Sequence, residues 1–273
     1  MNSSESIFYW ITALLHAVTF VTILLAIIFK KTSLFKMARL FFLIAFVTLT
    51  IFGIIRWTRT GHPPFVTMFE SMITAIWFIM LIYHLFRMRY ECINIAILPA
   101  SLITLLMMGW SSSMSNEASP LSAALSNVWL FIHASFATAG AAAFLIAASL
   151  AILFLMGENR LNQMEKIATK VPIYNDLPRG VQNFMLFGLI LWGVMIISGS
   201  IWANIAWNRY WAWDPIEIWS LISWLLYGVI FHVHLAIGFS KRMYCWATII
   251  AALTIVFSLW GVQYLYETIH TYG

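Results

Sequence analysis

Charged residues are scarce in this chain of 273 residues. Asp, Glu, Lys and Arg together make up 9% of it, whereas 62% of the residues are hydrophobic and the mean hydropathy is +0.88. A soluble globular domain carries about 25% charged residues. The shortage of charge therefore excludes a sizeable soluble catalytic domain and indicates an integral membrane protein.

Cysteines are few, and the N-terminus lacks basic residues. Cys92 and Cys245 are the only cysteines and form no CxxC or CxxCH motif, which excludes a disulfide framework, a thiol redox pair and the usual covalent attachment of a c-type haem. The segment MNSSESIFYW at the start contains no Lys or Arg, so it lacks the basic start of a cleaved signal peptide. The first hydrophobic stretch is expected to remain as a membrane helix.

Long apolar runs are abundant instead. Because a helix needs about 20 apolar residues to cross a bilayer, these runs predict an all-α fold. We expect a polytopic membrane helix bundle with about eight transmembrane helices, in a single domain over residues 1–273. The expected spans are 7–29, 38–55, 66–86, 94–110, 127–156, 183–202, 216–239 and 245–266.

Basic residues are divided unevenly between the two sides of this bundle. Twelve of the 15 Lys and Arg residues follow the odd-numbered spans, and only Arg56, Arg59 and Arg209 fall on the other side. Cytoplasmic loops carry an excess of Lys and Arg, so both termini are predicted to lie on the non-cytoplasmic side. The net charge of +5 therefore reports topology, and no nucleic-acid partner is expected.

Tryptophan is unusually frequent, and six of the 14 tryptophans fall in the segment WANIAWNRYWAWDPIEIWSLISW. An interfacial belt accounts for some tryptophans at helix ends. A continuous aromatic loop instead favours an apolar, flat-walled platform for a large planar ligand. Asp214 and Glu217 in this segment match a helix capping box, with Pro215 at the first helical position.

This segment resembles the WWD signature of the CcsA/ResC family of haem-handling cytochrome c biogenesis proteins. The match covers most of the loop 202–219, including Trp213, Asp214 and Pro215. The segments RTGHPPFVTMFES, WLFIH, LLYGVIFHVHL and IHTYG are also similar to family segments, and the resemblance extends over about residues 53–273.

The resemblance implies two haem sites. His133 and His270 would be the axial iron ligands of an external haem, since imidazoles from two helices can approach opposite faces of a porphyrin. His232 would ligate an inner haem, with the opposite ligand from a CcsB/ResB partner or, alternatively, from His84. The plain alternative for His133 and His270 is an interfacial histidine that bonds water or a carbonyl. The other expected haem-binding residues are Trp202, Trp207, Trp211, Trp213 and Asp214.

The implied function is that of a haem-handling subunit of a system II cytochrome c synthetase in a bacterial inner or thylakoid membrane. It would move non-covalently bound haem b to the external face, where the WWD loop lies, for thioether attachment to the CxxCH segment of an apocytochrome c. Haem-lyase activity is expected only with CcsB/ResB, and no residue is identified as catalytic. The alternatives are a b-type haem anchor for electron transfer and a HemX-like regulatory protein.

Overall fold

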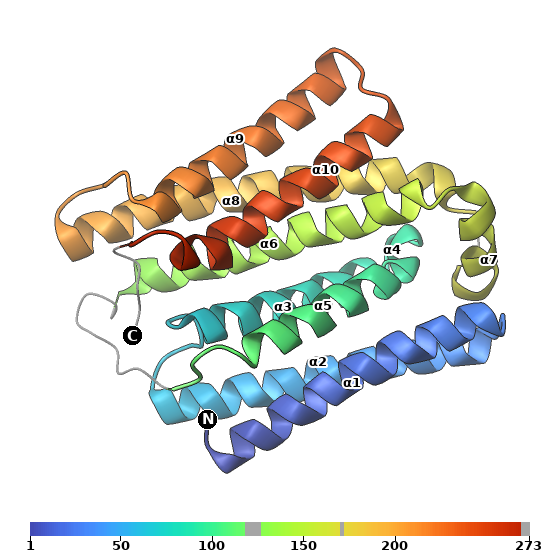
Figure 1. The fold of residues 1–273 in the computed structure, drawn as a ribbon, viewed down its shortest axis with the longest axis horizontal. Helices are drawn as coiled ribbons and strands as arrows, with labels where there is room; N and C mark the ends of the chain where they lie inside the picture. Colours follow the sequence, from blue (N-terminus) through green and yellow to red (C-terminus); the bar gives the residue numbers. More distant parts are fainter. Residues whose placement is uncertain (118–126, 170–171, 269–273) are drawn as a thin grey trace.

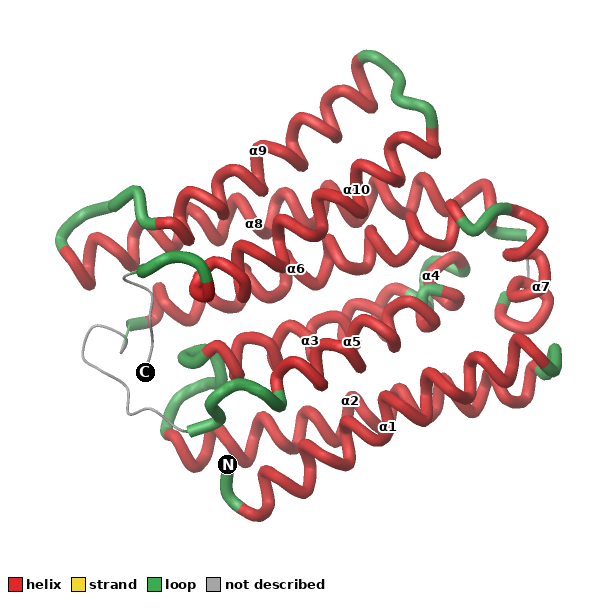
Figure 2. Tube along the Cα trace, viewed as in Figure 1, coloured by secondary structure: helices red, strands yellow, loops and turns green. Residues whose placement is uncertain are grey.

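The computed structural model describes residues 1–117, 127–169 and 172–268, and within these ranges the chain is helical without a strand (Figures 1 and 2). Seven helices are long and apolar enough to cross a membrane. They are α1 (Ser3–Ile28), α2 (Thr32–Thr60), α3 (Met68–Phe86), α6 (Val128–Leu155), α8 (Leu177–Trp207), α9 (Pro215–Ala236) and α10 (Lys241–Val256). Helix α10 reaches a crossing length because a π-helical turn, Phe257–Gly261, and a 3-10 turn, Val262–Tyr264, continue it to a span of 24 residues. The predicted polytopic helix bundle is therefore confirmed.

The remaining predicted span is a shorter helix. The expected segment 94–110 corresponds to α5 (Ile97–Ser111), an apolar helix of 15 residues preceded by the four-residue helix α4 (Cys92–Ile95). Helix α5 alone is below the length of about 20 residues that a perpendicular crossing needs, but α4 and α5 together extend over residues 92–111, which reach that length. An eleven-residue helix, α7 (Glu158–Ala168), lies in the connection between α6 and α8.

The long helices form successive pairs across the molecule. Figure 1 shows the α1–α2 pair at one edge, then α3 with α5, then α6 with α8, and finally α9 with α10. Helix α6 is the centre of the bundle, since 89% of its most apolar stretch is buried, against 22% of that of α9. Small residues allow α6 and α8 to approach closely: a Cβ atom added to Gly188 would lie 2.6 Å from the Phe144 ring.

Three capping boxes lie at one end of the bundle. They start α1 at Asn2 and Glu5, α3 at Thr67 and Glu70, and α9 at Asp214 and Glu217. In each, the first side chain accepts a backbone N–H and the glutamate returns the bond, which satisfies donors that a helix start otherwise leaves unpaired. The capping box predicted for α9 is confirmed.

A buried cluster of charges ties α1, α2 and α3 together at this same end. Arg56 donates from Nε to Oε1 of Glu70 over 2.6 Å, and Arg59 donates from Nε to Oε1 of Glu5 over 2.6 Å. The side chains of Arg56, Glu5 and Glu70 are fully buried. Removing one member would leave an uncompensated buried charge, so the cluster fixes the arrangement of the three helices.

Candidate functional site

His133 lies near the start of α6 and is oriented by α8. Its Nδ1 atom is 2.9 Å from the carbonyl oxygen of Met195. Because a carbonyl only accepts, Nδ1 is the donor in this hydrogen bond. A histidine whose other ring nitrogen donates to a backbone carbonyl is the usual arrangement of a metal-ligating imidazole.

Two residues of α8 pack on the His133 ring. Trp202, which is buried, stacks on it with ring centroids 6.0 Å apart and planes 19° apart. On Gly199, an added Cβ atom would lie 2.6 Å from Nδ1 of His133. The ring therefore occupies the space that a side chain at position 199 would fill, and its orientation depends on that glycine.

The WWD segment 202–219, predicted as a loop, is helical at both ends, because α8 continues to Trp207 and α9 begins at Pro215. The loop between the two helices contains two residues with left-handed backbone. Asn208 ends α8 with φ of 56°, and Trp213 has φ of 59°. Positive φ is common for Asn at a helix end but is an outlier for a bulky residue, and such strain persists only where surrounding bonds enforce it. Glu217 provides those bonds, because its Oε2 atom accepts the N–H of Ala212 at 2.8 Å and of Asp214 at 3.2 Å.

Asp214 joins the WWD loop to the C-terminal segment. Its Oδ1 atom accepts both the N–H of Ile216 at 3.0 Å and the hydroxyl of Thr268 at 2.9 Å. Thr268, which contacts the loop through this bond, precedes His270 by two positions in the sequence. His270 itself lies outside the described residues. Asp214 is therefore both the cap of α9 and an anchor for the segment that leads to His270.

The four predicted haem-binding tryptophans differ in their surroundings. Trp202 is buried, with the ring of Trp207 4.8 Å away at 64°. Trp213 is 70% exposed and stands nearly perpendicular to Trp211, with centroids 5.9 Å apart. The buried Nε1 of Trp211 has no hydrogen-bond partner within the part of the chain that the structure describes. The pairs Trp202–Trp207 and Trp211–Trp213 therefore meet edge to face.

A small cavity separates His133 from this loop. Its volume is about 60 Å³, and its lining includes His133, Gly199, Trp202, Trp211 and Glu217. Pockets that enclose drug-sized ligands measure about 300–1,000 Å³. This cavity is therefore too small to enclose a porphyrin.

His232 lies in a much larger space. It is exposed near the end of α9 and lines an open apolar groove of about 710 Å³ between α8 and α9, together with Gly193, Trp224 and Gly228. The indole of Trp224 donates to the carbonyl of Leu189 over 3.0 Å and holds the two helices together at this level. The volume of the groove is in the range of ligand pockets.

His84 is not brought to His232. It packs between the rings of Phe42 and Phe46 on α2, with centroids 5.6 and 5.7 Å away. Figure 1 shows α2 and α9 at opposite edges of the bundle, with α6 and α8 between them. The two histidines therefore face different sides of the molecule.

Sequence reasoning did not single out Gly199, Met195, Thr268, Gly193 or Gly228. Met195 contributes a backbone carbonyl and Thr268 a single hydroxyl, for which the sequence gives no signal. The glycines stand inside apolar helices, where glycine is unfavourable unless close packing or a groove requires it. The unfavourable placement of these glycines inside helices is the only feature of the sequence that could have pointed to them.

The apolar helices define an integral multi-pass membrane protein, whose candidate site is a histidine packed beside a tryptophan-rich loop. The family model described as "Cytochrome C assembly protein" matches residues 65–270. The chain therefore belongs to the cytochrome c assembly protein family, as its resemblance to CcsA/ResC predicted.

Named relatives agree with this assignment. The chain is 28% identical to the "Cytochrome c biogenesis protein CcsA" of Prochlorococcus marinus over 292 residues, which cover 95% of this chain and 92% of the relative. It is 28% identical to the protein of the same name from Chlamydomonas reinhardtii over 232 residues, which cover 82% of this chain and 65% of the relative. The family membership makes this chain a cytochrome c maturation protein, with haem and apocytochrome as the implied cargo and substrate.

A solved structure has a similar fold. The "Cytochrome c Heme Lyase CcmF" superimposes with a TM-score of 0.71 at 16% sequence identity. The superposition covers 95% of this chain but 47% of that protein, so the chain spans about half of its length. At this identity the likeness concerns the fold alone.

Proposed function

We propose that the chain receives haem inside the membrane and presents it beside the WWD loop for attachment to the CxxCH segment of an apocytochrome c. The observation that carries this proposal is the fixed orientation of His133 by Met195, Gly199 and Trp202, next to the loop. The tie from Asp214 to Thr268 supports a second ligand from His270, two positions further on.

The residues of the chain contribute binding and orientation. His133 and His270 would hold the iron from two sides, and the Met195 carbonyl would orient the His133 ring and raise its basicity. The tryptophans would cover the apolar rim and exclude water, while Asp214 holds the loop in place. The reacting groups are the haem vinyls and the apocytochrome thiols, so the protein contributes mainly positioning.

We further propose that His232 binds an inner haem in the groove between α8 and α9, opposite a ligand from a CcsB/ResB partner in a system II synthetase. The exposure of His232 supports a ligand from outside this chain. The proposed topology places both termini and the WWD loop outside the cytoplasm. The separation of His84 from His232 does not support an electron-transfer anchor with both ligands of this haem in one chain.

The test of the outer site is to co-express the chain with a CcsB/ResB partner and a reporter apocytochrome and to measure covalently bound haem. His133→Ala and His270→Ala should each abolish most of it, with partial rescue by added imidazole, because imidazole replaces the missing ligand. Ser135→Ala, on the same helix, is the control. Wild-type maturation by both histidine variants would exclude this site.

The inner site has an independent test in the optical spectrum of the purified protein. His232→Ala should lose the signal of an inner haem. His234→Ala should keep it, because two residues correspond to about 200° around a helix, so His234 points away from the groove. Unchanged haem content in His232→Ala would contradict the inner site and leave the outer one standing.

A further inference from the structure

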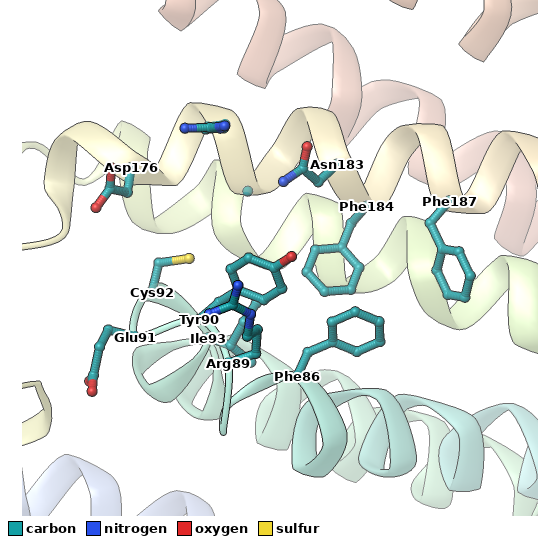
Figure 3. Close-up of a pocket in the computed structure, with 12 residues that line it drawn as sticks. Phe86, Arg89, Tyr90, Glu91, Cys92, Ile93, Asp176, Asn183, Phe184 and Phe187 are labelled. Atoms are coloured by element: carbon teal, nitrogen blue, oxygen red, sulfur yellow. The ribbon is translucent and has the colours of Figure 1, made fainter.

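A further cavity lies between the end of α3 with α4 and the start of α8, and its lining includes none of the histidines described above. Its volume is about 740 Å³. Figure 3 shows Phe86, Phe184 and Phe187 at one end, and Cys92, Glu91 and Asp176 toward the other. By the distribution of Lys and Arg, this is the cytoplasmic side of the proposed topology.

The apolar end of the cavity is built from aromatic rings. The Phe86 ring lies 5.2 Å from that of Phe184, 6.0 Å from that of Phe187 and 6.2 Å from that of Tyr90, which it faces at 14°. Aromatic walls of this kind favour a planar apolar ligand.

Two cations without a carboxylate partner complete the lining of the cavity. Arg89 and Arg179 line the cavity and are exposed, and neither forms an ion pair within 4.0 Å among the described residues. Glu91 accepts the Asn94 side chain at 3.0 Å. A guanidinium group binds carboxylates in a two-point geometry, so two such groups suit a ligand with two carboxylates.

Neither the thiol nor the histidine content of the cavity favours iron binding. Burial, assisted by the negative charge of Asp176, raises the pKa of the Cys92 thiol to about 11, and a protonated thiol is a poor metal ligand. No histidine lines the cavity. Recognition would therefore depend on the ring and the carboxylates of a ligand and not on its metal.

The cavity adjoins the groove of His232 along α8. Phe187 of the cavity and Ile190 of the groove are three residues apart, less than one helical turn. The hydrogen bond from Trp224 to Leu189 places these two residues at the same level of α9 and α8. His232 lies eight residues after Trp224 on α9, which runs antiparallel to α8, and eight residues correspond to about 12 Å at 1.5 Å per residue. His232 is thus level with the part of α8 that lines the cavity, and a ligand would reach it by moving around α8.

We propose that this cavity receives a porphyrin dicarboxylate at the cytoplasmic side, with the ring against Phe86, Phe184 and Phe187 and the carboxylates at Arg89 and Arg179, before it passes to His232. This inference rests on the proposed function, since it supplies the haem that His232 and His133 would then hold.

The test uses the full chain in nanodiscs of neutral lipid, with metal-free protoporphyrin IX as the fluorescent probe, because that probe binds without iron ligation. The double variant Arg89→Glu/Arg179→Glu should weaken binding about tenfold, since each exposed ion pair contributes modestly and is replaced by repulsion. Asn183→Trp, which fills the cavity from α8, should weaken it at least as much. Arg160→Glu, an exposed cation on α7 outside the cavity, should bind as the wild type does.

A second probe isolates the carboxylates. Protoporphyrin IX dimethyl ester should bind the wild type more weakly than the free acid, and the charge reversal should not weaken it further. Equal binding of the free acid by the wild type and by both cavity variants would overturn the proposal. It would also be overturned if the charge reversal removed co-purified acidic phospholipid without changing porphyrin affinity, because the cavity would then be a lipid headgroup site.

The spectrum of the iron porphyrin complex separates this inference from the proposed function. Iron ligation that depends on His133 and His232, together with unaltered porphyrin binding in the cavity variants, would overturn the cavity and keep the function. Cavity-dependent binding of metal-free porphyrin without any histidine-dependent iron spectrum would support the cavity and overturn the function.

Discussion

The two ends of this bundle are built in opposite ways. The end that carries His133 contains three capping boxes, a buried charge cluster, the Asp214–Thr268 bond and a cavity of about 60 Å³. Near His232 and at the start of α8, the spaces measure about 710 and 740 Å³, and the helices that line them carry exposed side chains.

This difference matches two tasks, which are holding a ligand in a fixed position and letting a ligand enter. A catalytic or presenting site needs atoms held in place by buried polar bonds, and such bonds also keep a site closed. An entry route needs open apolar surface along which a large ligand moves with little reorganisation. Under the proposed function, the end with His133 would present haem and the end with His232 would receive it.

The largest expected effect comes from breaking the outer charge cluster. Arg56→Met should lower the free energy of unfolding by about 3–5 kcal/mol, because it leaves Glu70 buried without its partner. Thermal unfolding in detergent measures this. Arg209→Met, an exposed cation in the WWD loop, should change stability by less than about 1 kcal/mol. Equal losses in both variants would contradict a rigid outer end.

Gly199→Val should disable the outer site without unfolding the bundle. The new Cβ atom would occupy the place of the His133 ring, and a displacement of about 1 Å in a positioned group costs about a hundredfold in rate. The measurement is covalent haem in the reporter cytochrome. Gly53→Val, where an added Cβ meets nothing within 4 Å, is the matched control. Normal haem attachment with Gly199→Val would show that the His133 orientation is unimportant.

Gly228→Leu tests whether the open groove beside His232 holds the inner haem. No atom lies within 4 Å of an added Cβ at this position, so the side chain should fill the groove without loss of stability. We expect about tenfold weaker inner haem binding, equivalent to about 1.4 kcal/mol, read from the optical spectrum of the purified protein. Unaltered inner haem content would mean that the groove is not its site.

Asp214→Ala should have the smallest of these effects. The variant loses the cap of α9 and the bond to Thr268, and loss of a cap costs about 1 kcal/mol. Amide hydrogen exchange should become faster in the loop 208–214 and in the segment before Thr268. Asn2→Ala, which removes the cap of α1 at the same end, should leave exchange in that loop unchanged. If both variants loosen the loop equally, the Asp214–Thr268 bond does not control it.

Local features were predictable from neighbouring residues. The capping box at Asp214 and Glu217 is confirmed because both partners lie within three positions, and the helical bundle is confirmed because apolar length alone requires it. The steep angles between the tryptophan rings were not predictable, because they depend on packing between α6, α8 and the loop. The haem-ligand roles of His133, His270 and His232 remain predictions.

By itself, the sequence determined the membrane class, the helical architecture, the family and the tryptophan-rich loop, since each follows from composition or from contiguous residues. Only the tertiary structure decided that Met195 and Gly199 orient His133, that Thr268 reaches Asp214, and that His84 faces away from His232. It also decided where the open spaces lie. The physical reason is that bonds and cavities between distant helices depend on crossing angle and rotation, which no local pattern in the chain encodes.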